Sequence, residues 1–142
     1  MDFGLSDSAT LLQNTIDEIT DEFDLKYWRR KDDVNEFLAE VWDEFTEADF
    51  SGMLALQEYG GSGYGMTEMV SASLKFGRQG GGVSGPNLLT SPVMGTTLLL
   101  EIGTEEQKER LLPQIVDGTF VAIDLTEPDA GTDTVCIKMR AK

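Results

Sequence analysis

The sequence predicts a mainly α-helical fold of five helices, followed from residue 119 by the beginning of a β region. Apolar residues recur at helical spacing in five segments up to Gly118, and after Gly118 the pattern becomes strand-like. The length of 142 residues predicts one domain with the start of another. A hydrophobic content of 40% is enough to build a buried core in a chain of this size.

The first two expected helices carry the clearest apolar stripes. A helix over residues 7–23, capped by Ser6 or Asp7, has a stripe formed by Leu12, Ile16, Ile19 and Phe23. Residues 24–33 are expected to form a polar connector. The next helix has one apolar face, formed by Val34, Phe37, Leu38, Val41, Trp42, Phe45 and Ala48. Carboxylates line its other face, and a solvated surface is favoured there over a cation site.

The third and fourth expected helices are bounded by glycine-rich loops at 60–65 and 80–85. The third runs over residues 67–78, with four apolar residues facing inward, Met69, Val70, Leu74 and Phe76. The fourth lies within 86–102. Pro86 suits its first turn, whereas Pro92 is expected to kink or restart the helix because proline lacks an N–H donor.

The fifth expected helix begins with a capping box formed by Thr104 and Gln107, and Gly118 closes it. Its apolar residues are Leu111, Leu112, Ile115 and Val116. Strands are expected near 119–125 and 135–141. Because an isolated hairpin is only marginally stable, these strands should pack on the helices, pair with another chain or require further residues.

The charge of the chain excludes some classes of partner. Asp and Glu number 26 against 11 Lys and Arg, which gives a net charge of −15. Such a potential repels phosphate backbones and anionic lipids, so we expect neither nucleic-acid binding nor binding to anionic membrane surfaces. The sequence has no apolar run of about 18 residues, so we expect no membrane insertion. An acidic disordered segment is one interpretation, but the regular apolar periodicity argues against it. Adaptation to high salt is favoured, because dissolved salt screens the repulsion between like charges.

The residue types provide no self-sufficient catalytic or metal site. Histidine is absent, which excludes a Ser-His-Asp triad and a histidine-ligated zinc within this sequence. The single cysteine, Cys136, excludes an internal disulfide and a thiolate cluster. Gly80, Gly82 and Gly85 match the spacing of a dinucleotide-binding loop, but a helix precedes them where a strand is required. We therefore favour a flexible loop between helices.

The most informative segment is the expected strand and turn over residues 120–133. Pro128 ends ladder pairing, and Gly131 allows a sharp turn or a close approach to a ligand. Thr126 and Thr132 place hydroxyl groups at the two ends of the turn. Such a segment can hold a planar polar ligand. From the residue types alone, however, an ordinary strand that ends in a proline turn is favoured.

Four stretches resemble the acyl-CoA dehydrogenase family, in the family's own order. Residues 120–133 resemble its flavin-binding signature, which ends in T-E-P-x-A-G-S-D, and residues 56–63 resemble its L-P-E-E-Y-G-G-S-G. Residues 76–78 are similar to its E-L-G-R, and residues 103–113 to its G-T-E-E-Q-K-x-R-Y-L-P. The resemblance implies a five-to-six-helix N-terminal domain over 1–118 and the beginning of the middle β domain over 119–142. Family members continue through a β domain and a C-terminal helical bundle, so we expect a truncated chain.

The resemblance implies an enzyme of fatty acid metabolism that dehydrogenates an acyl-CoA thioester between Cα and Cβ and passes a hydride to FAD. It implies that Ile123, Leu125 and Thr126 contact the isoalloxazine ring, and that Gly131 and Thr132 lie beside the flavin, with Thr132 also near the acyl-CoA. The catalytic base of the family usually lies in the C-terminal bundle. We therefore expect no catalytic residue in this chain and neither activity nor tight FAD binding by the chain alone. An electron-transfer flavoprotein as acceptor and a homodimer or homotetramer are also implied.

Some residues depart from the family pattern. Asp129 replaces a usual glycine, Gln57 replaces a usual proline, and Asp124 occupies a usually small or apolar position that is tolerated only if it faces outward. Thr90 and Met94 lie where the family places part of its substrate pocket, but a core role is favoured for both.

Two other functions remain open. One is a non-catalytic helical interaction module that recruits a partner through an exposed strand edge. The other is a flavin oxidase or monooxygenase of the same fold. The first residues lack the basic region and apolar core of a signal peptide, which predicts a cytoplasmic protein.

Overall fold

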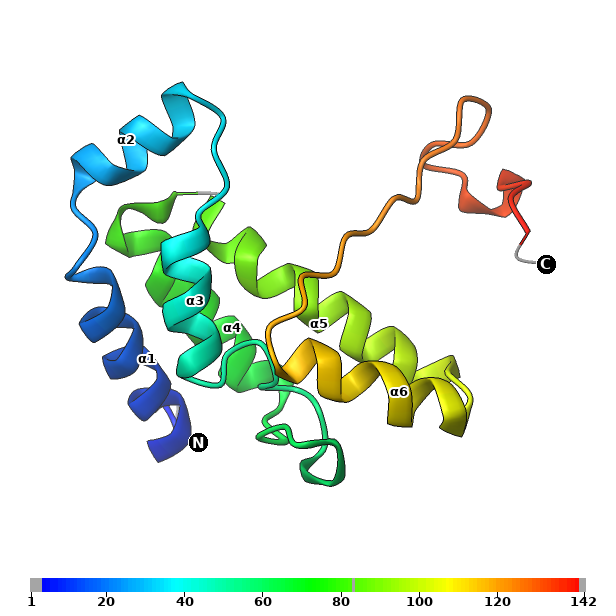
Figure 1. Cartoon of the computed structure of the whole chain (residues 1–142), viewed down its shortest axis with the longest axis horizontal. Helices are drawn as coiled ribbons and strands as arrows, with labels where there is room; N and C mark the ends of the chain where they lie inside the picture. Colours follow the sequence, from blue (N-terminus) through cyan, green and yellow to red (C-terminus); the bar gives the residue numbers. More distant parts are fainter. Residues whose placement is uncertain (1–3, 83, 141–142) are drawn as a thin grey trace.

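The computed structural model describes residues 4–82 and 84–140. Val83, in the second glycine-rich loop, and residue 141, at the end of the second expected strand, lie outside the described residues. Within these ranges the chain forms six α-helices, α1 (Asp7–Thr20), α2 (Leu25–Asp33), α3 (Ala39–Glu47), α4 (Met66–Phe76), α5 (Ser84–Ile102) and α6 (Glu105–Val116). The helices pack together, and the residues after α6 extend away from them (Figure 1). The predicted mainly α-helical fold is confirmed.

Helix α2 replaces the polar connector that was expected over 24–33, and that prediction is wrong. The Asp24 side chain caps the helix by accepting hydrogen bonds from the backbone N–H groups of Lys26 and Tyr27 at 2.9 and 2.8 Å. Trp28 is buried and packs edge-on against Phe76, with ring centroids 5.8 Å apart. One cap and one large buried aromatic side chain therefore hold a helix whose other residues are mostly polar.

Helix α3 begins later than the sequence predicts. Asn35 adopts a φ of 51°, in the left-handed region that interrupts a helix, and α3 starts at Ala39. Val34 and Phe37, which were expected on the inward face, lie in the connector before α3 and are exposed. Leu38, Val41, Trp42 and Phe45 are buried as predicted.

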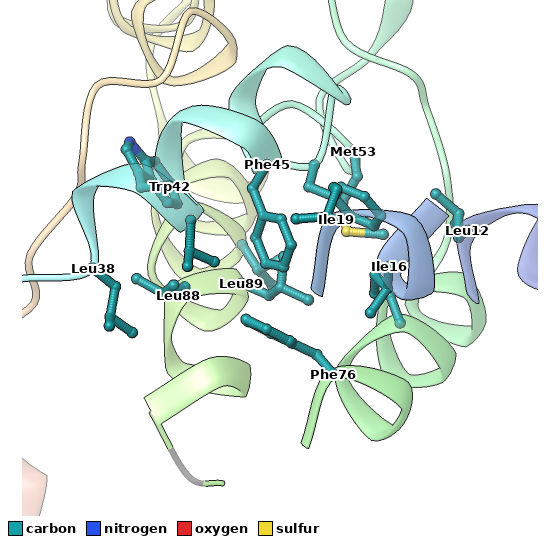
Figure 2. Packing of buried hydrophobic residues seen from close by; sticks show 14 of the residues in the cluster. Leu12, Ile16, Ile19, Leu38, Trp42, Phe45, Met53, Phe76, Leu88 and Leu89 are labelled. Carbon is teal, nitrogen blue, oxygen red and sulfur yellow. The ribbon is translucent and has the colours of Figure 1, made fainter. Parts of the chain in front are cut away.

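The core lies between α1, α3, α4 and α5 (Figure 2). The α1 stripe of Leu12, Ile16 and Ile19 is buried as predicted, and Phe23 packs partly buried beside the cluster. Phe45 lies at the centre, with ring centroids 4.5 Å from Phe76 and 5.1 Å from Phe50. Full burial of such a side chain stabilises the fold by roughly 1.5–3 kcal/mol.

The expected inward face of α4 is confirmed at Phe76 and Met69 but is wrong at two other positions. Val70 and Leu74 are exposed, whereas the small residues Ser71 and Ala72 are buried. Small residues allow α4 to lie close to α1, where the Gln13 amide donates a 2.9 Å hydrogen bond to the Ser71 hydroxyl. Polar bonding at a close helix contact thus takes the place of the expected apolar pair.

Helices α5 and α6 complete the helical region. Helix α5 runs through Pro92 without a restart, contrary to one of the two expectations for this residue. Leu88, Leu89 and Val93 hold it against the core, which compensates for the lost hydrogen bond. The capping box of α6 is confirmed, since the Thr104 hydroxyl accepts from the Gln107 N–H at 3.3 Å and the Gln107 side chain accepts from the Thr104 N–H at 2.9 Å.

Neither strand expected over 119–125 and 135–141 forms within the described residues. Residues 119–126 have no regular secondary structure, Glu127 and Ala130 form an isolated antiparallel bridge, and Thr134–Cys136 form a 3₁₀ turn. A strand requires a partner to complete its hydrogen-bond ladder, and the described chain pairs none with this segment. The domain boundary after residue 118 stays a prediction.

Candidate functional site

The segment that carries the candidate site leaves the helices at a well-packed point. Phe120 packs edge-on against Phe37 and Trp42, with ring centroids 5.2 Å away in both pairs. Val121 lies over Gly95 of α5 so closely that a Cβ atom at Gly95 would sit 2.9 Å from the valine side chain. These contacts anchor the start of the segment, and the following residues extend away from the helices (Figure 1).

The five residues that the resemblance implicates in flavin binding lie on this extended part. Ile123 and Leu125 leave 45% and 60% of their surfaces exposed, and Thr126, Gly131 and Thr132 are also exposed. All five are therefore open to a ligand or a further part of the protein, and none of them belongs to the helical core.

The departures from the family pattern are compatible with this geometry. Asp124 is exposed, as an acidic residue at that position requires. Asp129 has no positive φ, because the positive-φ residues other than glycine among those described are Asn35 and Asp49. The turn therefore does not need the glycine that the family usually places where Asp129 stands.

No backbone strain or close contact within the described chain requires a glycine at position 131. Its φ is not in the positive range, and a Cβ atom built on it would meet nothing within 4 Å. By contrast, a Cβ atom at Gly61, in the 56–63 motif, would lie 2.2 Å from the carbonyl oxygen of Ala55. The motif glycine at 61 therefore has a packing role, whereas the described chain leaves open space at Gly131.

Thr90 and Met94 lie on α5. The Thr90 hydroxyl donates to the Pro86 carbonyl at 3.0 Å, and the threonine is partly buried. Met94 is exposed, so its expected core role is wrong. Helix α5 presents this methionine on the outside because Val93 and Gly95 occupy the inward positions on either side of it.

A hollow of about 600 Å³ opens on another part of the surface, between α2, the connector to α3 and the start of α5. Its walls are formed by Trp28, Arg29, Lys31, Asp32, Asn35, Glu36, Phe37, Leu38, Gly80, Gly82, Ser84, Asn87, Leu88 and Phe120. None of the five predicted flavin-binding residues lines it. We assign it no ligand, because its buried ammonium group, that of Lys31, already has partners on the protein.

Lys31 belongs to an ionic cluster that joins α2 to α3. Its side chain is only 2% exposed and lies 2.8 Å from a Glu36 oxygen and 2.9 Å from a Glu40 oxygen. The Tyr27 hydroxyl donates to Glu40 at 2.8 Å. The hydrogen bond from Lys31 lowers the pKa of Glu40 to about 2, and burial, together with Glu40, raises the pKa of Tyr27 to about 12. The cluster is a structural clasp for these two helices.

Metal and membrane features are not evident in the part of the chain that the structure describes. Over residues 4–82 and 84–140, no group of three or more Asp, Glu, Cys or His side chains is arranged to hold a metal ion. In the same ranges, every helix is too short or too polar to cross a bilayer.

Comparison with known proteins places the chain in a family. The sequence profile of "Acyl-CoA dehydrogenase, N-terminal domain" matches residues 6–119. The chain belongs to the acyl-CoA dehydrogenase family. FadE12, an acyl-CoA dehydrogenase of Mycobacterium tuberculosis (strain ATCC 25618 / H37Rv), is 33% identical over 118 residues, which cover 82% of this chain and 30% of FadE12.

Other members of the acyl-CoA dehydrogenase family match along nearly the whole chain. Mitochondrial isovaleryl-CoA dehydrogenase of Pongo abelii is 32% identical over 142 residues, which are 98% of this chain and 33% of that enzyme. A chain in the solved structure "Electron transferring flavoprotein of Acidaminococcus fermentans: Towards a mechanism of flavin-based electron bifurcation" is 28% identical, with a TM-score of 0.80, over 96% of this chain and 36% of its own length. The present chain thus spans about a third of these proteins.

Proposed function

We propose that this chain supplies the N-terminal domain of a FAD-dependent acyl-CoA dehydrogenase, which removes hydrogens from Cα and Cβ of an acyl-CoA thioester. The observation that carries the proposal is the family match over residues 6–119, directly followed by the signature segment 120–133. Members of this family depend on FAD. The exposure of the signature residues supports the proposal, because a ligand can reach them without unfolding the helices.

The proposed domain organisation is a helical domain over 1–118 and the beginning of a β domain over 119–142. Beyond Phe120, which packs on the helices, the described residues of the second part expose Ile123, Leu125, Val135 and Met139. Exposed apolar residues on an extended, unpaired backbone are typical of strands that complete a sheet with other segments. In this proposal the sheet partners come from a further part of the protein.

The residues present suit a flavin. Backbone groups of Ile123 and Leu125 and the Thr126 hydroxyl would bind the isoalloxazine ring, while Gly131 and Thr132 would lie beside it and Thr132 would also approach the acyl-CoA. The open space at Gly131 supports a close approach by a flat ligand. When bound here, FAD would supply the acceptor for the substrate hydride, at its N5 atom. The base that removes the α proton would come from outside this chain, whose own task is to position the ring and the thioester.

An electron-transfer flavoprotein as the acceptor and a homo-oligomeric assembly are part of the same proposal. The acyl-chain length is not assigned, since the residues that would line an acyl pocket are not fixed by any motif.

An FAD titration tests the proposal. The 142-residue chain alone should give no tight, stoichiometric FAD complex by absorbance, because most flavin contacts would lie outside it. The full-length protein should contain FAD whose absorbance is bleached by an acyl-CoA under anaerobic conditions. A full-length protein without flavin, or with flavin that no acyl-CoA reduces, would contradict the proposal.

A non-catalytic interaction module is a second candidate, favoured by the unpaired backbone of residues 119–126. It predicts a symmetric oligomer of the 142-residue chain in which this segment is covered. Sedimentation of the isolated chain distinguishes the interaction module from the dehydrogenase. The dehydrogenase proposal predicts that residues 119–126 stay uncovered in the isolated chain.

A flavin oxidase of the same fold would instead produce hydrogen peroxide from oxygen during turnover.

We also propose that the protein is adapted to high salt. Only five ion pairs form within the described residues, although the sequence contains 26 acidic residues. Most carboxylates therefore repel one another without a compensating cation, and this repulsion weakens as the Debye length falls to about 3 Å at 1 M salt. The melting temperature should rise between low and molar KCl. A melting temperature that stays flat over this range would exclude the proposal.

A further inference from the structure

The Glu127 side chain closes a loop that contains the turn of the candidate flavin site. The Glu127 carboxylate accepts a 2.9 Å hydrogen bond from the backbone N–H of Lys138 with one oxygen and a 2.7 Å bond from that of Met139 with the other. These partners lie 11 and 12 residues further along the chain. A single carboxylate therefore closes the loop from 127 to 139.

The backbone of Glu127 fixes the near side of the same loop. Its N–H donates to the Ala130 carbonyl at 3.0 Å, and its carbonyl accepts from the Ala130 N–H at 3.1 Å. Ala130 is buried at 2% exposure although the residues around it are exposed. Glu127 thus belongs to both the tight turn and the closure of the longer loop, and its neighbour Thr126 precedes the turn while Gly131 and Thr132 come after it.

Other contacts contribute less to the closure. Lys138 forms a 3.1 Å ion pair with Asp129, but both side chains are largely exposed, and ion pairs in such settings contribute little to stability. Hydrogen bonds that a carboxylate accepts from backbone N–H groups are stronger than neutral ones. Within the described residues the segment has no strand ladder, and between residues 127 and 139 these two bonds join the parts of the backbone that are furthest apart in sequence.

We propose that Glu127 is a positioning residue for the flavin site, which it serves by holding Thr126, Gly131 and Thr132 in one fixed arrangement. The inference rests on the proposed function, because it concerns the same site. Glu127 does not itself need to touch the flavin. Each of its carboxylate oxygens accepts from one backbone N–H, and an amide at this position would turn an NH₂ donor toward one of these groups.

The first test concerns the loop in the 142-residue chain and needs no flavin. In Glu127→Gln one acceptor oxygen becomes an NH₂ donor that faces a backbone N–H. The amide hydrogens of Lys138 and Met139 should exchange faster with solvent, by about tenfold for loss of one charge-assisted bond. Glu101→Gln, an exposed glutamate near the end of α5, is the matched control and should leave both amides unchanged. Unaltered exchange in Glu127→Gln would overturn the proposed closure.

The second test uses the full-length protein with FAD. Glu127→Gln should weaken FAD binding by about tenfold and shift the visible flavin spectrum, while the melting of the helices stays unchanged. Glu127→Asp keeps both oxygens on a shorter stem and should restore part of the affinity, and Asp129→Asn should have no effect because it removes only the exposed ion pair.

The outcomes distinguish a failure of the proposed function from a failure of the positioning role of Glu127. If wild-type protein does not bind FAD, the proposed function fails, even when amide exchange shows the loop closed by Glu127. If wild-type protein binds FAD and Glu127→Gln matches it in affinity and spectrum, the proposed function stands and the positioning role is wrong.

Discussion

In the helical region Phe45, Phe50 and Phe76 are almost fully buried, whereas in residues 119–140 Val135 and Met139 leave 92% and 77% of their surfaces exposed. The backbone groups of the helices form hydrogen bonds within the helices, while those of the later residues form them in short turns and with the Glu127 side chain. The difference shows that the helical part of the chain encodes its own packed structure, whereas the described residues after it form only short turns.

The largest expected effect comes from opening the helical core. Phe76→Ala removes the ring that contacts both Trp28 and Phe45 and should lower the free energy of unfolding by about 3–5 kcal/mol. Urea denaturation of the 142-residue chain measures this loss. A loss below about 1 kcal/mol would mean that the core is less tightly packed than its burial indicates.

Substitution by alanine should lower the free energy of unfolding at Gly61 but leave it nearly unchanged at Gly131. Gly61→Ala brings a methyl group against the Ala55 backbone and should destabilise the chain by about 1–3 kcal/mol or more. Gly131→Ala meets no atom within 4 Å and should leave stability within about 0.5 kcal/mol. In the full-length protein, Gly131→Ala should nevertheless weaken FAD binding. Equal effects of the two variants on unfolding would contradict the contrast between the regions.

Acid should loosen the clasp between α2 and α3. Because the Lys31 hydrogen bond lowers the pKa of Glu40 from 4.5 to about 2, the stability it provides is present above pH 4.5 and is lost as pH falls toward 2. Thermal melting at a series of pH values should show this loss in the wild-type chain. Glu40→Gln should melt lower at neutral pH and lose less on acidification, and parallel profiles for the two proteins would argue against the clasp.

The smallest expected effect lies in the later residues. Val135→Ser changes an almost fully exposed side chain and should alter the free energy of unfolding of the 142-residue chain by less than about 0.5 kcal/mol. Urea denaturation beside Phe76→Ala gives the comparison directly. A loss above about 1 kcal/mol would show that Val135 is covered in solution, for example by a second copy of the chain.

Local patterns predict most of the helices, because capping and apolar periodicity are short-range signals. The Thr104–Gln107 box and the α1 stripe are confirmed, since each lies within a few turns. Helix α2 escapes prediction because Trp28 is its main apolar contact with the core, which gives no periodicity. Val70 and Leu74 are wrongly expected inward because the sequence does not show that α1 approaches α4 through small residues.

The site residues come from a signature and not from residue physics, and their role in binding stays a prediction. The segment containing Thr126 and Thr132 can be singled out from its hydroxyls, proline and glycine. The part played by Glu127 cannot, because its partners Lys138 and Met139 lie 11 and 12 residues away without any pattern that marks them. Side-chain to backbone bonds of this kind become visible only in three dimensions.

Val121 packs against Gly95, and Phe120 packs against the rings of Phe37 and Trp42. These contacts have a consequence for how the chain folds during synthesis. Domains generally fold as units during translation, the N-terminal one first. The helices can therefore be complete while the ribosome is still adding later residues, and the next segment would emerge already aimed in one direction. A bulkier residue at position 95 would then displace Val121 and change the direction in which the following residues leave the helices.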